Sequence, residues 1–354
     1  MLWQGRQVDL RSEVTTRPTP AMWSAMQEAE IGWPQRGDDR NVNELERYGA
    51  ELTGLEACLF VFTASIANLL ALMVATSRGD QVILDADSHQ VWIEGWNLAY
   101  ICGVYPRLVK SERGLMPLDE VRAALDGWRG PAHPRTSLIA LESPHNDHGG
   151  TIVPVDHIEA LTELAHAYGC HAHMDGARIH NAAVATGVPV RQFTQSLDTV
   201  TISLNKGLGA PVGALLCGSR AHIAMARERG LRWLGASGMH RGGLFAAAGL
   251  YALEHMVDRL AGDHLRARTI ADGIRDLPGI DVNHPETNQV KVSTDPSGRL
   301  AEEFVSALAA RAVLVTLREP YVFKMMVHHE INDEAVDLAV QQARTVVCEL
   351  GSSR

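Results

Sequence analysis

A single lysine, Lys206, stands between an apolar segment and a glycine-rich loop. The segment Thr199 to Leu204 precedes it, and Gly207-Leu208-Gly209-Ala210-Pro211 follows. A lysine amine has a pKa of about 10.4 in water, so its nucleophilic neutral form is scarce unless burial or imine formation favours it. A lysine in this setting can form a Schiff base with a carbonyl group. The common alternative is a solvated loop lysine.

A carboxylate ends a second apolar segment, in His171-Ala172-His173-Met174-Asp175-Gly176-Ala177-Arg178. A buried carboxylate at Asp175 needs a cationic partner. A protonated pyridine nitrogen would be such a partner, and the pair would make the ring an electron sink. A salt bridge to Arg178, or capping of the next turn, explains the spacing equally well.

The same segment permits a different chemistry. In an alternating strand His171, His173 and Asp175 share one face, as the ligands of a zinc hydrolase would, with further histidines available at 145, 148 and 180. The hydrolase pattern would continue with Asp-His, whereas Gly176 follows here. The pattern therefore favours packed strand histidines, and we expect no metal site.

Two other segments suit a flat, phosphorylated ligand. His89, in Asp87-Ser88-His89, could stack on a ring or move protons, although a lone loop histidine is more often merely exposed. Thr63-Ala64-Ser65 opens a predicted helix, where hydroxyl and N–H groups either bind phosphate or simply cap the helix. The sequence contains neither GxGxxG nor GxxxxGK[ST], so dinucleotides and nucleoside triphosphates have no support as ligands.

Strands and helices alternate around these residues. We expect helices over 65–76 and 155–168, and strands over 81–85, 137–141, 170–174, 199–204 and 212–217. Such alternation predicts right-handed crossovers and a mainly parallel sheet. Sites in these sheets lie beyond the carboxyl ends of the strands, which is where the segments 85–89, 142–148, 175–178 and 205–206 fall.

The rest of the chain predicts a second, smaller unit. A long helix over 243–260 leads into amphipathic helices over 266–277, 300–312 and 333–350, which flank short strands. The length of 354 residues suits one large and one small domain. We place the large domain at residues 1–250 and a smaller C-terminal α/β domain at residues 251–354.

Composition excludes several classes of protein. The net charge of -10, without a basic stripe, argues against nucleic-acid partners. The longest apolar stretch, 66–75, is too short to span a membrane, and Met1-Leu2-Trp3-Gln4 lacks the apolar core of a signal peptide. The five cysteines are scattered singly, which predicts reduced, buried thiols rather than disulfides. We expect a cytoplasmic protein.

Together these segments resemble the threonine aldolases, in the β-eliminating lyase group of fold-type I pyridoxal-phosphate enzymes. The resemblance is clear from Val8 to Leu260 and rests on Asp9-Leu10-Arg11-Ser12, Gly37-Asp38-Asp39, Ala67 to Leu72, Gly149-Gly150-Thr151, Asp175-Gly176-Ala177-Arg178 and Lys206 to Gly213. It implies a large domain with a mainly parallel seven-stranded sheet. It also implies pyridoxal 5′-phosphate as cofactor, and cleavage of the Cα–Cβ bond of a β-hydroxy-α-amino acid to glycine and an aldehyde.

The resemblance further implies roles for individual residues. Lys206 would bind the cofactor, Asp175 would hold the ring nitrogen and His89 would stack on the ring. The phosphate would lie against Thr63, Ala64 and Ser65. Arg178 would border the cofactor and, with Ser12, bind the substrate carboxylate. His145 would lie near the substrate hydroxyl and, like His89, could act as the base. Members are usually homo-oligomers, so we expect a homodimer or homotetramer with shared sites.

The departures from the family concern recognition of the carboxylate. The family has an arginine near residues 321–329, where this chain offers Lys324 or Met325. The family's Met-Arg-Gln reads Met239-His240-Arg241 here, and an expected tyrosine is Arg36. Our hypothesis is that Arg36 or Arg241 supplies the missing charge. The alternatives are β-elimination or racemisation of an unusual amino acid with the same cofactor, and a scaffold without catalysis.

Overall fold

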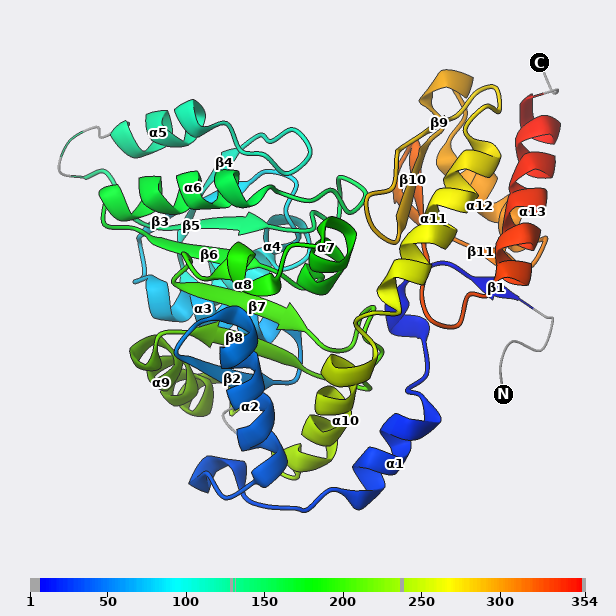
Figure 1. Ribbon diagram of the computed structural model, residues 1–354. Coiled ribbons are helices and arrows are strands. Elements are labelled where there is room, and N and C mark those ends of the chain that lie inside the picture. Colours follow the sequence, from blue (N-terminus) through cyan, green and yellow to red (C-terminus); the bar gives the residue numbers. More distant parts are fainter. Residues whose placement is uncertain (1–6, 128–129, 131, 236–238, 352–354) are drawn as a thin grey trace.

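The chain forms a larger and a smaller body, each built around its own sheet (Figure 1). The computed structural model describes residues 7–127, 130, 132–235 and 239–351. The segment 1–4, on which the expectation about a signal peptide rests, lies outside these residues. Within the described part of the chain, no helix combines the length and the apolar character needed to cross a lipid bilayer.

The larger body confirms the predicted mainly parallel sheet of seven strands. Its strand order is β2-β8-β7-β6-β5-β3-β4, and β8 alone runs antiparallel to both neighbours. The strands are β2 (Ala57–Val61), β3 (Gln81–Asp85), β4 (Tyr105–Val109), β5 (Thr136–Glu142), β6 (His171–Asp175), β7 (Thr199–Ser203) and β8 (Ala214–Gly218). Sequence patterning did not single out β2 or β4. β4 is an edge strand that exposes most of its residues, so it lacks the continuous apolar run of a buried parallel strand.

Helices cover both faces of this sheet and bury the apolar strand residues between them. Phe193 and Ile202 lie in the core on one face, and Leu70 and Leu216 lie in the core on the other. One face carries α2 (Arg40–Thr53), α5 (Leu118–Asp126), α6 (Val155–Ala167), α7 (Ile179–Thr186), α8 (Val190–Thr194) and α10 (Gly242–His255), and the other carries α3 (Ala64–Ala75), α4 (His89–Trp92), η3 (Asn97–Cys102) and α9 (Arg220–Arg229). Each such buried side chain contributes about 1.5–3 kcal/mol to folding.

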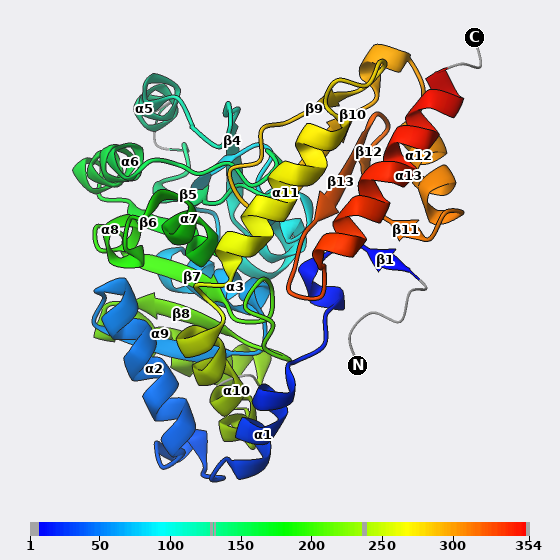
Figure 2. The ribbon, with the colours of Figure 1, turned by 45° about the vertical axis from the view of Figure 1, so that its right-hand side comes forward.

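The smaller body is a four-stranded antiparallel sheet covered by helices (Figure 2). Its strand order is β12-β13-β10-β9, from β9 (Asp281–Val282), β10 (Gln289–Ser293), β12 (Thr316–Glu319) and β13 (Val322–Met326). The helices are α11 (Leu260–Ile274), α12 (Ala301–Ala309) and α13 (Asp333–Gly351). Near the N-terminus, β1 (Val8–Asp9) pairs in parallel with β11 (Val313–Leu314), so Val8 and Leu10 join the core of the smaller body. The domain boundary at residue 250 stays a prediction.

The single helix expected over 243–260 is wrong. α10 ends at His255, and α11 starts at Leu260 after a short turn. Met256 and Leu260 both lie in the core of the larger body, and the turn between them lets both side chains face it. The later helices over 266–277, 300–312 and 333–350 correspond to α11, α12 and α13.

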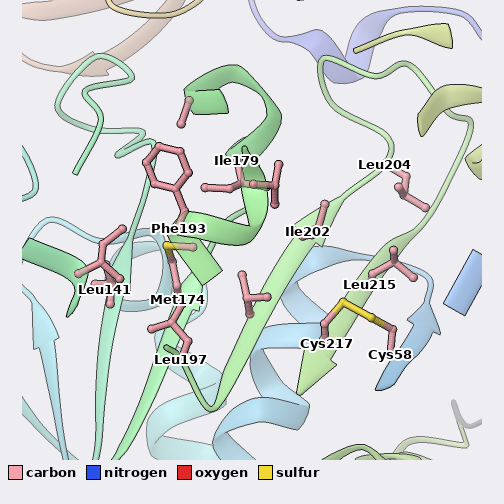
Figure 3. Packing of buried hydrophobic residues seen from close by; sticks show 14 of the residues in the cluster. Cys58, Leu141, Met174, Ile179, Phe193, Leu197, Ile202, Leu204, Leu215 and Cys217 are labelled. Carbon is pink, nitrogen blue, oxygen red and sulfur yellow. A yellow bond between two sulfur atoms is a disulfide. The ribbon is translucent and has the colours of Figure 1, made fainter. Parts of the chain in front are cut away.

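The expectation that all cysteines are reduced is also wrong. Cys58 and Cys217 form a disulfide in the core of the larger body (Figure 3). The two residues lie directly opposite each other in the antiparallel register of β2 and β8, although 159 residues separate them in sequence. Cys102 and Cys170 are buried free thiols, as expected. Cysteines that are scattered singly along a sequence can therefore still form a disulfide when a sheet brings them together.

Gly213, at the end of the loop after Lys206, lies where any side chain would be strained. It has a φ of +124°, and a Cβ there would lie 2.5 Å from the ring of Phe60. We expect Gly213→Ala to destabilise the protein by about 2–5 kcal/mol, because backbone strain adds to overpacking. Gly79 has a φ of +90° with open space around it, so Gly79→Ala should cost only about 1–2 kcal/mol. Chemical denaturation measures both, and equal losses would contradict this account of Gly213.

Candidate active site

The residues with chemical potential meet at one edge of the seven-stranded sheet. β3, β5, β6 and β7 run parallel, so the loops that follow them emerge at the same edge. In the register of β5 and β6, Glu142 lies beside Asp175, and Lys206 follows β7, the next strand. The structure thus brings Glu142, Asp175 and Lys206 together at the sheet edge that the sequence predicts for them.

Asp175 is a buried carboxylate that stays ionised. One oxygen accepts a hydrogen bond from the backbone N–H of Ala177 at 3.0 Å, so it does cap the next turn. The other oxygen accepts from the amide of Asn68 at 2.9 Å. Burial alone would raise the pKa of Asp175, but the cations Lys206 and His89 and the Asn68 hydrogen bond hold that pKa below its ordinary value. Arg178 forms its ion pair elsewhere.

Lys206 is the cation next to this carboxylate. The backbone N–H of Gly209 donates to the Lys206 carbonyl at 2.9 Å, which closes the loop tightly after the lysine. Burial and the neighbouring Arg178 lower the pKa of the Lys206 amine, and the carboxylates of Asp175 and Glu13 oppose this only in part. A lowered pKa increases the neutral fraction of the amine, which is the form that attacks a carbonyl group.

Asn68 links Asp175 to a buried histidine. Its side-chain oxygen lies 3.2 Å from Nε2 of His173, whose Nδ1 lies 2.9 Å from the hydroxyl of Thr199. Burial lowers the pKa of His173 to about 4, so the ring is neutral. Because both ring nitrogens have hydrogen-bond partners, this geometry does not support the zinc site considered for the strand. In the sequence Asn68 stands out only as part of the motif Ala67 to Leu72, although an amide inside an apolar helix is itself a signal of a buried polar partner.

His89 lies against Asp175 and is held by a glutamate that sequence analysis missed. Its Nδ1 is 2.8 Å from Oε1 of Glu94, and its backbone N–H donates to Glu142 at 2.7 Å. A ring nitrogen of His89 and one carboxylate oxygen each of Glu94 and Asp175 lie within 4.8 Å of one another. Burial lowers the pKa of His89, but the hydrogen bond to Glu94 and the charge of Asp175 outweigh it and raise the pKa overall.

The start of α3 faces the same region with free hydrogen-bond donors. Thr63 caps the helix by accepting from the N–H of Ile66 at 3.2 Å, and Ser65 donates its hydroxyl to Glu94 at 2.8 Å. The N–H groups of Ala64 and Ser65 have no acceptor among the described residues. An exposed helix start of this kind binds phosphate well.

A buried ion pair anchors the N-terminal segment to the site. Arg178 donates from Nε and Nη2 to the two oxygens of Glu13 at 2.7 and 2.8 Å, and Asn288 donates to the same carboxylate at 2.9 Å. Burial would raise the pKa of Glu13, but Arg178 holds it well below its ordinary value. Ser12 directly precedes Glu13, and its predicted role in binding the substrate carboxylate stays a prediction. Glu13 and Asn288 carried no recognisable signal in the sequence.

His145 occupies a closed environment. It is fully buried, with Nε2 3.1 Å from Oδ2 of Asp85, and its Nδ1 accepts the backbone N–H of His148 at 3.4 Å. Burial lowers the pKa of His145, and the carboxylates of Glu142 and Asp85 more than reverse this. Its role as a base therefore stays a prediction.

Arg36 and Arg241 lie apart from the other site residues in this chain. Arg36 is exposed, and its guanidinium carbon lies 4.4 Å from the centre of the Trp33 ring. Arg241 is exposed at the start of α10. Asp39 accepts hydrogen bonds from Gly32 and Gly243, so both arginines belong to the region where α2 and α10 begin. This region lies at the bottom of Figure 1, together with α1 (Pro20–Glu28).

The Glu13–Arg178 pair gives a test of site stability. We expect Glu13→Gln to destabilise the protein by about 3–5 kcal/mol at pH 7, because it leaves a buried guanidinium without its counterion. The lowered pKa of Glu13 means that its contribution is present above the unfolded value of 4.5 and is lost as the pH falls below it. The difference in unfolding free energy between wild type and Glu13→Gln should therefore become smaller as the pH is lowered, which denaturation curves recorded at a series of acidic pH values will measure.

The control is Glu51→Gln, which removes the exposed partner of Arg47 at 2.6 Å. It should leave stability unchanged within error, because exposed pairs are solvated and screened. A Glu13→Gln effect as small as that of the control would contradict the role given to the buried pair.

Comparison with known proteins shows the family of this chain. The family model described as "Beta-eliminating lyase" matches residues 9–297. The chain is 39% identical to a probable low-specificity L-threonine aldolase 2 of Arabidopsis thaliana, over 94% of this chain and 95% of that protein. It is 37% identical to the low specificity L-threonine aldolase of Escherichia coli strain K12, over 92% and 95% of the two chains. A Leishmania major threonine aldolase structure shares the fold, with a TM-score of 0.82 at 16% identity, covering 96% of this chain and 99% of that one. The chain therefore belongs to the β-eliminating lyase family.

Proposed function

We propose that this protein is a pyridoxal-phosphate-dependent aldehyde-lyase that cleaves β-hydroxy-α-amino acids of the threonine type to glycine and an aldehyde. The observation that carries the proposal is the proximity of the Lys206 amine to the buried Asp175 carboxylate, at the ends of the neighbouring strands β7 and β6. The lowered pKa of both groups supports it. Its relatives named as threonine aldolases span nearly the whole chain, which supports the same reaction.

The residues present fit this cofactor. Lys206 supplies the amine that would bind the aldehyde of the cofactor, and Asp175 supplies a carboxylate for its ring nitrogen. The free N–H groups of Ala64 and Ser65 supply hydrogen-bond donors for its phosphate. His89 offers a flat ring beside Asp175. When bound, the cofactor supplies an electron-poor ring that takes up the negative charge left on Cα when the Cα–Cβ bond breaks.

The chain's own residues would hold and move the protons of the reaction. Asp175, kept ionised by the neighbouring cations and by its hydrogen bonds, would retain a proton on the ring nitrogen. Arg178, fixed by Glu13, would orient the substrate with Ser12. A base, His89 or His145 acting through water, would accept the proton of the β-hydroxyl group, and the Lys206 amine would return a proton to Cα.

We also propose a homodimer or homotetramer in a cytoplasmic setting, with sites completed across an interface. The segment from α4 to η3 exposes three large aromatic side chains, Trp92, Trp96 and Tyr100, each more than two-thirds accessible. Such patches mark contact surfaces. Arg36 and Arg241 would reach a substrate only from a neighbouring protomer, so their proposed role depends on this assembly.

The alternatives predict other products. β-Elimination would give a keto acid, and racemisation would give the mirror-image amino acid, whereas the proposed reaction gives glycine. The similarity to threonine aldolases over nearly the whole chain does not favour these alternatives. Glycine and keto-acid assays on the same sample separate the reactions.

Lys206→Ala should abolish covalent cofactor binding. We expect the wild-type protein to show a visible absorbance band that borohydride bleaches, with the label fixed on Lys206. The variant should lack the band and lose activity. The chain has only four lysines, and the exposed Lys110 provides the control, since Lys110→Ala should keep both band and label. Peptide mapping that finds the label on another lysine would refute the assignment.

Asp175→Asn should retain the cofactor but react slowly. The neutral amide cannot hold a proton on the ring nitrogen, so kcat should fall by at least about 100-fold, at the lower end of proton-positioning effects. Absorbance and circular dichroism would confirm that cofactor and fold are kept. A variant with wild-type kcat would show that the ring nitrogen does not depend on Asp175.

A further inference from the structure

Lys324 is a buried lysine on β13, a central strand of the smaller sheet. Figure 2 shows this strand beside β12. Lys324 lies opposite Lys291 of β10 and Thr316 of β12, and is only 2% exposed. A buried ammonium group needs strong compensation, usually from a carboxylate. Among the described residues, Lys324 forms no ion pair.

The contacts of Lys324 lead to the site described above. Its Nζ donates to the backbone oxygen of Asn146 and, at 3.1 Å, to the side-chain oxygen of the same residue. Nη1 of Arg178 reaches that side-chain oxygen at 3.5 Å. Two cations from different bodies thus converge on one neutral amide oxygen, and a third N–H of Lys324 remains for another acceptor.

The charged groups around Lys324 leave an excess of positive charge. The cations are Arg178 at the start of α7, Arg318 on β12 and Lys291 on β10. The anions are already engaged: Asp147 pairs with Arg318, Glu142 accepts the backbone N–H groups of His89 and Asn146, and Glu13 pairs with Arg178. Burial, and next Arg178, lower the pKa of Lys324 to about 7, against the smaller effects of Asp147 and Glu142.

We propose that Lys324 and Arg178 together bind the carboxylate of the amino-acid substrate, and that Lys324 takes up a proton when it binds. This inference rests on the proposed function, since it concerns the substrate of the same site. A carboxylate between the two cations would supply the missing counterion and satisfy the free N–H of Lys324. It identifies Lys324 as the charge that Arg36 and Arg241 do not provide within one protomer.

A purely structural lysine would behave differently. If Lys324 served only to hold the loop at Asn146, its loss would weaken folding but would not change proton uptake on ligand binding. If it binds the carboxylate, affinity is highest below pH 7, where the amine is charged, and falls as the pH rises through 7. Arginine stays charged throughout this range, so Lys324→Arg should bind without the pH dependence.

The experiment measures binding of glycine to the cofactor-loaded protein by calorimetry between pH 6 and 8.5, in buffers of different ionisation enthalpy. At pH 8 we expect glycine binding to transfer as much as about one more proton to the wild-type protein than to Lys324→Arg. The reason is that the Lys324 amine is mostly neutral before glycine binds. Lys324→Met should weaken glycine binding and raise the KM for the amino acid by about 10- to 100-fold, with a much smaller change in kcat. Lys110→Met is the matched control.

Equal proton uptake by wild type and Lys324→Arg, or an unchanged KM in a folded Lys324→Met variant, would overturn the inference. Should Lys324→Met fail to fold, the comparison with Lys324→Arg still decides it. The visible absorbance band of the bound cofactor is recorded for every variant. A variant that keeps the band but loses proton uptake has a defect in carboxylate binding and not in cofactor binding. A loaded wild-type protein that binds glycine but releases none from any β-hydroxy-α-amino acid would refute the proposed function and leave the proton measurement interpretable.

Discussion

The ionised state of Asp175 is the condition on which the rest of the site depends. A carboxylate inside a protein tends to accept a proton, which would leave nothing to hold a cationic ring nitrogen. Here Lys206 and His89 counter that tendency, and Asn68 and the N–H of Ala177 satisfy the oxygens. The same proximity lowers the cost of keeping a cation near the sheet edge. Each charge is therefore tolerated because the other is present.

Neutral groups then fix the geometry of the charged ones. The chain of hydrogen bonds from Thr199 through His173 to Asn68 ties β7, β6 and α3 together behind Asp175. Because His173 is neutral, it orients Asn68 without adding a competing charge. Ser65 and Glu94 connect the start of α3 to His89 in a similar way. The helices α3 and α4 thus set the positions of groups that would contact a ligand.

The sequence was informative where local pattern decides structure. Apolar runs and their polar ends located β3, β5, β6, β7 and β8, and so the edge holding Asp175 and Lys206. It was uninformative where contacts join distant segments. Glu13 lies 165 residues from Arg178, and nothing near Glu13 marks it as a partner. Cys58 and Cys217 meet only because β2 and β8 pair in one register, and Lys324 acquires its setting from Asn146, 178 residues away.

The pairing of β1 with β11 joins a segment that is synthesised early to one that is synthesised late. Val8 finds its partner Val313 only after most of the chain has left the ribosome. Until then Leu10 lacks part of the core that it enters, and the segment bearing Ser12 and Glu13 lacks the strand pairing that precedes it. The substrate-binding part of the site should therefore assemble late in biogenesis. A chain truncated before residue 313 should form the seven-stranded sheet, but its segment bearing Ser12 and Glu13 should be less well ordered.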